Sequence, residues 1–208
     1  MFVESMTFEE IRKEFNKDKK VLMKHIVFHG KKIYKFMRHT NMHHYDKYHD
    51  YMSPQKNHWV IRMKADSQKT GDGLITQYCY YFTRRSYSVL SYSAVTDKLF
   101  FYRGHFFTRF YQREELEKDF MHDLIKKYLD INHISVTQPL ADLGNGIIRV
   151  FGQLTTGVAL GYHHQEINLT EFRTFISNDM LKGDQVTLSK MLEEKFKLHV
   201  VRKAPEES

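Results

Sequence analysis

The sequence has little of several features that define common protein classes. Its 208 residues contain only three prolines and one cysteine. A single cysteine excludes an internal disulfide and a cage of thiolate ligands around a metal. No apolar run approaches the ~20 residues of a membrane-spanning helix. Residues 1–15 lack the basic-then-apolar order of a secretory signal. We therefore expect a cytoplasmic globular protein with no membrane partner.

Sequence motifs for nucleotide cofactors and for common hydrolases are also missing. The chain has no glycine-rich phosphate loop, no dinucleotide-binding fingerprint and no Gly-x-Ser-x-Gly elbow. We therefore expect no cofactor. The single cysteine, Cys79, lies within an apolar, strand-like run, where burial would keep its thiol protonated and unreactive.

Positive charge is concentrated in the first half of the chain. Residues 1–110 carry 20 Lys and Arg against 10 Asp and Glu, whereas residues 111–208 carry 12 against 15. Lys and Arg that neutralise phosphates release condensed counterions, which favours binding. The charge distribution therefore indicates RNA or another polyanion as a partner. The alternative is that the lysines only keep the surface soluble.

The pattern of apolar residues predicts an α+β fold with N-terminal helices. Thr7-Phe8-Glu9-Glu10 is a capping box, which starts a helix, and apolar residues then recur at mostly three- and four-residue steps or their sums as far as Phe36. The best boundary is Ser53-Pro54, so we predict an N-terminal helical region over residues 1–53. Four runs with period-two alternation follow and predict an antiparallel β-meander: 58–64, 75–83, 87–95 and 99–102.

The remaining elements complete an α+β domain over residues 57–200. Helical spacing returns after the fourth strand, over residues 105–128. A second β-hairpin is predicted from 147–154 and 158–162, followed by a strand over 169–176 and a short C-terminal helix over 187–197. Residues 201–208 are expected to form a frayed tail.

The sharpest chemical signal directly follows the fourth predicted strand. His105, Arg109 and Arg113 are spaced four residues apart, so a helix would place them along one side. An imidazole can transfer a proton, and guanidinium groups can stabilise negative charge on a phosphate. The alternative is that His105 caps the corner and the arginines form surface ion pairs with nearby carboxylates.

This His-x-x-x-Arg-x-x-x-Arg segment, within residues 103–113, resembles a segment of the RelE- and BrnT-type toxin ribonucleases and of the wider barnase-like nuclease group. The resemblance implies metal-independent cleavage of an RNA phosphodiester. It implies that His105 acts as acid or base and that Arg109 and Arg113 bind the phosphate. It also implies a catalytic role for Thr174, near the end of a late strand.

Aromatic and basic residues alternate in the predicted hairpin over residues 75–95. Exposed tyrosine rings can stack on bases while arginines hold the phosphates. The alternative is that the tyrosines are half-buried strand residues. We predict that nucleic acid is bound by Tyr80, Arg84, Arg85 and Arg103.

Two further possibilities come from the N-terminal region. His39 and His43 have the spacing of metal ligands on a helix, and His44, His49, Asp46 and Asp50 lie near them in the sequence. No Glu completes a His-Glu-x-x-His arrangement and no cysteine is near, so no metal site is predicted, and a metal-dependent enzyme built on this cluster is kept as a third hypothesis. The second hypothesis for function is a non-catalytic interaction module, of phage or mobile-element type, in which the N-terminal helix binds a protein partner.

Overall fold

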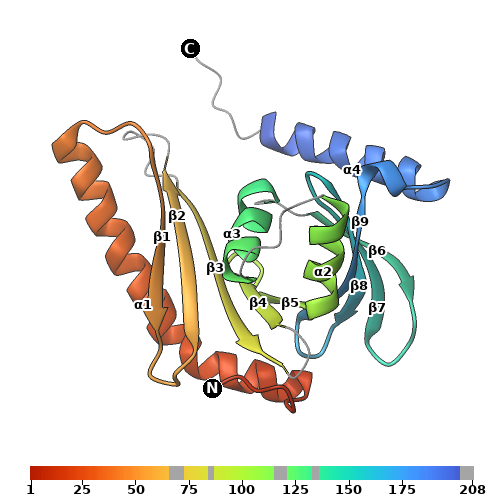
Figure 1. Cartoon of the computed structure of the whole chain (residues 1–208), viewed down its shortest axis with the longest axis horizontal. Helices are drawn as coiled ribbons and strands as arrows, with labels where there is room; N and C mark the ends of the chain where they lie inside the picture. The colour runs from red at the N-terminus through yellow and green to blue at the C-terminus, as the bar shows by residue number, and fades with distance from the viewer. Residues whose placement is uncertain (66–72, 84–86, 115–120, 133–135, 202–208) are drawn as a thin grey trace. The chain divides into compact units, whose positions relative to one another are not determined.

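The computed structural model describes residues 1–65, 73–83, 87–114, 121–132 and 136–201, and confirms an α+β fold (Figure 1). Nine strands follow the hydrogen-bonded order β1-β2-β3-β4-β5-β9-β8-β7-β6. The chain divides into two compact units. The first contains Met1–Phe101 and Ile167–Leu169, and the second contains Tyr102–Glu166 and Thr170–Ser208.

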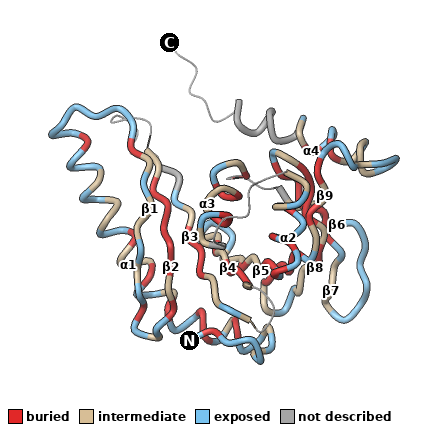
Figure 2. Tube along the Cα trace, in the orientation of Figure 1, coloured by how far each residue is buried: buried red, intermediate tan, exposed pale blue. Residues whose placement is uncertain are grey.

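The first unit is a long helix packed on a β-meander. Helix α1 spans Phe8–Thr40. The predicted capping box is present: the Thr7 hydroxyl accepts a hydrogen bond from the Glu10 backbone N–H, and the Glu10 carboxylate accepts one from the Thr7 backbone N–H. Its apolar stripe packs on the sheet, where β2 is buried along most of its length (Figure 2). The strands of this unit are β1 (Tyr45–Met52), β2 (His58–Ala65), β3 (Gly73–Phe82), β4 (Tyr87–Ser93) and β5 (Lys98–Tyr102).

Strand β1 departs from the predicted helical region over residues 1–53. Helix α1 ends at Thr40, where Asn41 takes a left-handed conformation, and Tyr45–Met52 pairs antiparallel with β2. The physical reason is a period-two pattern in this polar segment. Tyr45 and Tyr51 face the core beneath α1, whereas Asp46, on the opposite face, forms a two-point ion pair with Arg62 of β2 at 2.7 and 2.8 Å.

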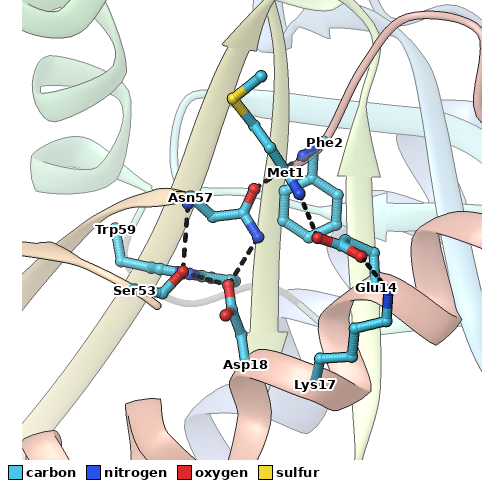
Figure 3. A network of polar contacts seen from close by, with 8 residues as sticks. All are labelled: Met1, Phe2, Glu14, Lys17, Asp18, Ser53, Asn57 and Trp59. Atoms are coloured by element: carbon cyan, nitrogen blue, oxygen red, sulfur yellow. Dashed lines mark hydrogen bonds and ion pairs between the residues drawn. The ribbon is translucent and has the colours of Figure 1, made fainter. Parts of the chain in front are cut away.

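A buried polar network anchors α1 to the start of β2 (Figure 3). The carboxylate of Asp18, which is fully buried, accepts hydrogen bonds from Asn57 Nδ2 at 2.7 Å and from Trp59 Nε1 at 3.0 Å. The side-chain oxygen of Asn57 accepts from the Phe2 backbone at 2.7 Å, and Ser53 Oγ accepts from the Asn57 backbone at 3.1 Å. Asn57 therefore satisfies groups from three separate segments.

Three half-buried histidines lie between α1 and β1. The rings of His25 and His29, one turn apart on α1, are 4.2 Å apart, and His49 of β1 lies 5.9 Å from His29. Tyr51 stacks on His25, and the Tyr45 hydroxyl is 2.9 Å from His49 Nε2. Burial and the neighbouring histidines lower the pKa of both His25 and His49. Protonation is therefore opposed at this contact.

The second unit is a sheet with helices on both faces. Phe151 and Gly152 are consecutive in β7 and so face opposite sides. Phe151 packs with Leu188 and Leu192 of α4, whereas Gly152 faces the ring of Phe172, which contacts α2. The elements of this unit are α2 (Gly104–Arg113), α3 (Met121–Ile131), β6 (Val136–Asp142), β7 (Ile147–Gln153), β8 (Gly157–His164), β9 (Leu169–Ser177), a 3-10 turn (Asn178–Met180) and α4 (Asp184–Val201).

Aromatic rings fill the space beneath α2. Phe106, Phe107 and Phe110 of α2 are fully buried, and all three contact Tyr128 of α3 with edge-on geometry. Phe110 also packs edge-on against Phe175 of β9, at 5.2 Å between ring centroids. This packing fixes which side of α2 faces the sheet. Within the described ranges, no helix is long and apolar enough to span a membrane.

Candidate functional site

Helix α2 brings two of the predicted catalytic residues together at its exposed surface. Arg109 Nε donates a hydrogen bond to His105 Nε2 at 3.1 Å, and both side chains are exposed. In this arrangement the Arg109 guanidinium contacts Nε2 of the His105 ring at the surface of α2.

Arg113 lies one turn beyond Arg109 and nearer to the core. Eight residues of α-helix rotate a side chain by about 80°, which moves Arg113 from the side of His105 toward the buried row of Phe106 and Phe110. Its Nη1 is buried without a hydrogen-bond partner, and burial together with the positive charge of Arg109 lowers the pKa of its guanidinium. Asp179 opposes that shift. Arg113 therefore lies at the margin of the core, beside an acidic group.

Thr174, the fourth predicted catalytic residue, lies at a different place in this unit. It lines a cavity of about 460 Å³ between β6–β9 and the start of α4, and none of His105, Arg109 and Arg113 lines that cavity. We call this space the α4 cavity. Its lining includes Arg149, Phe151, Tyr162, Arg173, Thr174 and Gln185.

Arg103, predicted to bind nucleic acid, is linked to the α4 cavity through a buried carboxylate. The side chain of Glu171 is fully buried, and its two oxygens accept from Arg103 Nε and, at 2.9 Å, from Arg173 Nε. The two arginine side chains are themselves half exposed, at 51% and 54%. Glu171 therefore holds two half-exposed guanidinium groups through one buried carboxylate.

Two further side chains extend this arrangement across the sheet. The Arg173 guanidinium lies 4.6 Å from the centre of the Tyr162 ring, a cation–π contact. Tyr162 of β8 pairs with Arg149 of β7, which also lines the cavity. We call Arg103, Arg173 and Arg149 the arginine row. The three arginines of the row and Glu171 together carry a net charge of +2.

Several polar groups around the cavity are available to a ligand. Among the residues that the structure describes, no partner is found for the Arg149 guanidinium or for the Thr174 hydroxyl. The Asp184 carboxylate lies in the first turn of α4 at the cavity wall, where a negative charge is stabilised by the helix dipole. The cavity therefore combines an apolar wall with unpaired donors and one acceptor group.

The chain matches no protein-family model, no curated protein and no solved structure. The assignment of a function to this site therefore depends on its own geometry and chemistry.

Of the predicted site residues in the first unit, the structure describes Tyr80. Tyr80 is half-buried on the sheet face opposite α1, where its ring contacts His58 at 5.6 Å and Tyr87 at 6.0 Å. Phe82, two residues further along β3, is 67% exposed. Arg84 and Arg85 lie outside the described residues, so their predicted phosphate contacts stay predictions.

The histidines singled out in the sequence do not gather at one place. His39 lies in the last turn of α1, His43 and His44 follow in the exposed loop, and His49 instead meets the two α1 histidines described above. Within the described part of the chain, no group of three or more His, Cys, Asp or Glu side chains could hold a metal ion.

The sequence interpretation missed Glu171, Arg173, Arg149 and Tyr162 as site residues. A local signal exists in β9, where Glu171 and Arg173 alternate with apolar residues and so share a face. Nothing local links them to Arg149, which lies 22 residues before Glu171 and 24 before Arg173. That proximity depends on the pairing of β7 with β8.

Proposed function

We propose that this chain is a cytoplasmic protein that binds RNA or a similar polyanion, and that the arginine row is its contact surface. The observation that carries this proposal is the buried Glu171 carboxylate, a single negative charge that orients both Arg103 and Arg173. Guanidinium groups held in this way lose little freedom on binding, so more of the interaction energy is kept.

The neighbouring aromatic ring supports a nucleic acid over a simple anion. Tyr162 is half-buried beside Arg173 on the sheet surface, and an aromatic side chain beside arginines is a common platform for unpaired bases. A single-stranded RNA can place phosphates on the arginines and bases over the sheet. A duplex offers phosphates but no exposed base faces.

The salt dependence of RNA affinity tests this proposal. Fluorescence anisotropy of a labelled single-stranded RNA, measured between about 50 and 200 mM salt, should give log K falling linearly with log salt, by about 0.7 per phosphate contact. The double variant Arg149→Gln/Arg173→Gln removes two contacts and should reduce the slope by about 1.4.

A matched variant controls for the loss of net charge. Lys31→Gln/Lys35→Gln removes the same charge from exposed positions on α1 and should leave the slope unchanged. If the α1 variant lowers the slope and the arginine variant does not, the proposed surface is wrong. If the wild-type protein shows no salt-dependent RNA binding, the proposed function is wrong.

Cleavage of RNA by His105, Arg109, Arg113 and Thr174 stays a separate prediction. The geometry supports it less than binding, because Thr174 lines a cavity that the other three residues do not reach. Incubation of RNA with the protein in EDTA tests it directly. Cleavage that disappears in His105→Ala, with unchanged thermal unfolding, would support catalysis, and intact RNA after long incubation would exclude it under those conditions.

The outer surface of α1 supports the second candidate, a protein-interaction module. Val27 and Phe28 are 51% and 55% exposed, and they line a shallow groove of about 650 Å³ together with four lysines. Exposed apolar side chains within a basic rim fit an acidic partner with an apolar patch. A photo-crosslinker at position 28 should give a discrete product that Val27→Glu abolishes, whereas a crosslinker at the exposed Lys13 should give none.

A further inference from the structure

The α4 cavity has the size and lining of a small-molecule site. Its volume of about 460 Å³ lies in the range of roughly 300–1,000 Å³ that such sites occupy. Phe151, Leu160 and Leu188 supply an apolar wall. A flat, largely apolar ring system would displace water from this wall at little cost.

The charged groups are unevenly placed around that wall. Arg149 and Arg173 come from β7 and β9, whereas Asp184 and Gln185 come from the first turn of α4. A ligand that satisfies both sets needs an anionic group for the arginines and N–H donors for the Asp184 carboxylate. It also needs an acceptor for the Thr174 hydroxyl or the Gln185 amide. A nucleotide has all three kinds of group.

We propose that the α4 cavity holds a single nucleotide, with its base among the apolar side chains and its phosphate on Arg149 and Arg173. This inference rests on the proposed function, since the nucleotide is one unit of a bound RNA strand. Arg173 is prepared for the phosphate, because Glu171 and Tyr162 already fix its guanidinium. Because the Asp184 carboxylate repels a phosphate, the hydrogen-bonding edge of the base faces α4.

Calorimetric titration with the four nucleoside 5′-monophosphates tests the inference. Ribose 5-phosphate and inorganic phosphate serve as probes that lack the base. At least one nucleotide should bind with 1:1 stoichiometry and at least about tenfold more tightly than ribose 5-phosphate. Equal affinities would overturn the proposal, because they would show that only the phosphate is recognised.

Two variants locate the binding. Leu188→Trp fills the cavity and should abolish nucleotide binding, whereas Leu143→Trp adds the same ring at an exposed position outside the cavity and should not. Thr174→Val keeps the size of the side chain and removes its hydroxyl. It should weaken nucleotide binding severalfold without affecting the fold, so the test holds even if Leu188→Trp is unstable. Unchanged nucleotide affinity in both cavity variants would overturn the assignment.

The RNA experiment separates this inference from the proposed function. Leu188→Trp leaves the arginine row intact, so it should keep the salt slope of RNA binding while losing the mononucleotide. RNA binding without any mononucleotide binding would refute the inference alone. Mononucleotide binding without RNA binding would refute the proposed function and leave the cavity as a nucleotide site.

Discussion

Replacement of Asn57 by alanine should strongly destabilise the first unit. The Asn57 side chain donates to the buried Asp18 carboxylate and accepts from the Phe2 backbone. A hydrogen bond to a charged group contributes about 1.5–3 kcal/mol, and a buried N–H left without an acceptor costs about 1–3 kcal/mol. Asp18 keeps its bond from Trp59, so we expect the free energy of unfolding to fall by about 3–5 kcal/mol.

The single tryptophan makes this change measurable at the site itself. Trp59 is fully buried and contacts Asp18 directly, so its fluorescence during urea unfolding reports on the first unit. Asn16→Ala, at an exposed position of the same helix, is the control and should change stability by less than about 0.5 kcal/mol. A loss below about 1 kcal/mol for Asn57→Ala would refute the reasoning that this network holds α1 on the sheet.

Three other predictions follow from burial and close contacts. The fold lowers the pKa values of His25 and His49, so below about pH 6.5 the unfolded chain binds more protons than the folded one and stability is lost as the pH falls. The urea midpoint should therefore be lower at pH 5.5 than at pH 7.5. The variant His25→Gln/His49→Gln should reduce that difference. Gly161→Ala places a Cβ 1.8 Å from a backbone oxygen of β9 and should cost at least about 2 kcal/mol in thermal unfolding, whereas Gly30→Ala, with no atom within 4 Å, should stabilise by about 0.5–1 kcal/mol. Burial raises the pKa of the Cys79 thiol, so Cys79 should react with a thiol reagent only after unfolding; rapid labelling of the native protein would contradict its placement in the core.

Local patterns were sufficient to predict most of the elements. The capping box at Thr7 and the period-two runs depend on neighbouring residues only, and the structure has a helix and strands at those places. The helix predicted over residues 105–128 is instead two helices, α2 and α3, with residues 115–120 between them outside the described part of the chain. Both helices bury aromatic side chains in the same core.

Strand β1 and the arginine row depend on partners that are distant in the sequence. The segment Tyr45–Met52 is too polar to give a clear strand signal, and its stability comes from pairing with β2 and from contact with α1. The arginine row similarly unites Arg103, the residue before α2, with Arg149 of β7 and Arg173 of β9. No spacing in the sequence predicts that these residues lie close together, because two helices and three strands separate Arg103 from β9.

The two groups of basic side chains in the second unit illustrate what makes a charged cluster suitable for binding. His105 and Arg109 are neighbours because of helical spacing alone, and their only mutual constraint is an exposed hydrogen bond, which is worth little in water. In the arginine row, Arg103 and Arg173 are fixed by a carboxylate that is fully buried, and Arg173 also rests on a ring. Orientation before binding lowers the entropic cost that a ligand must overcome. Anion binding is therefore expected at the arginine row, which the sheet assembles, rather than at His105 and Arg109, whose spacing is visible in the sequence.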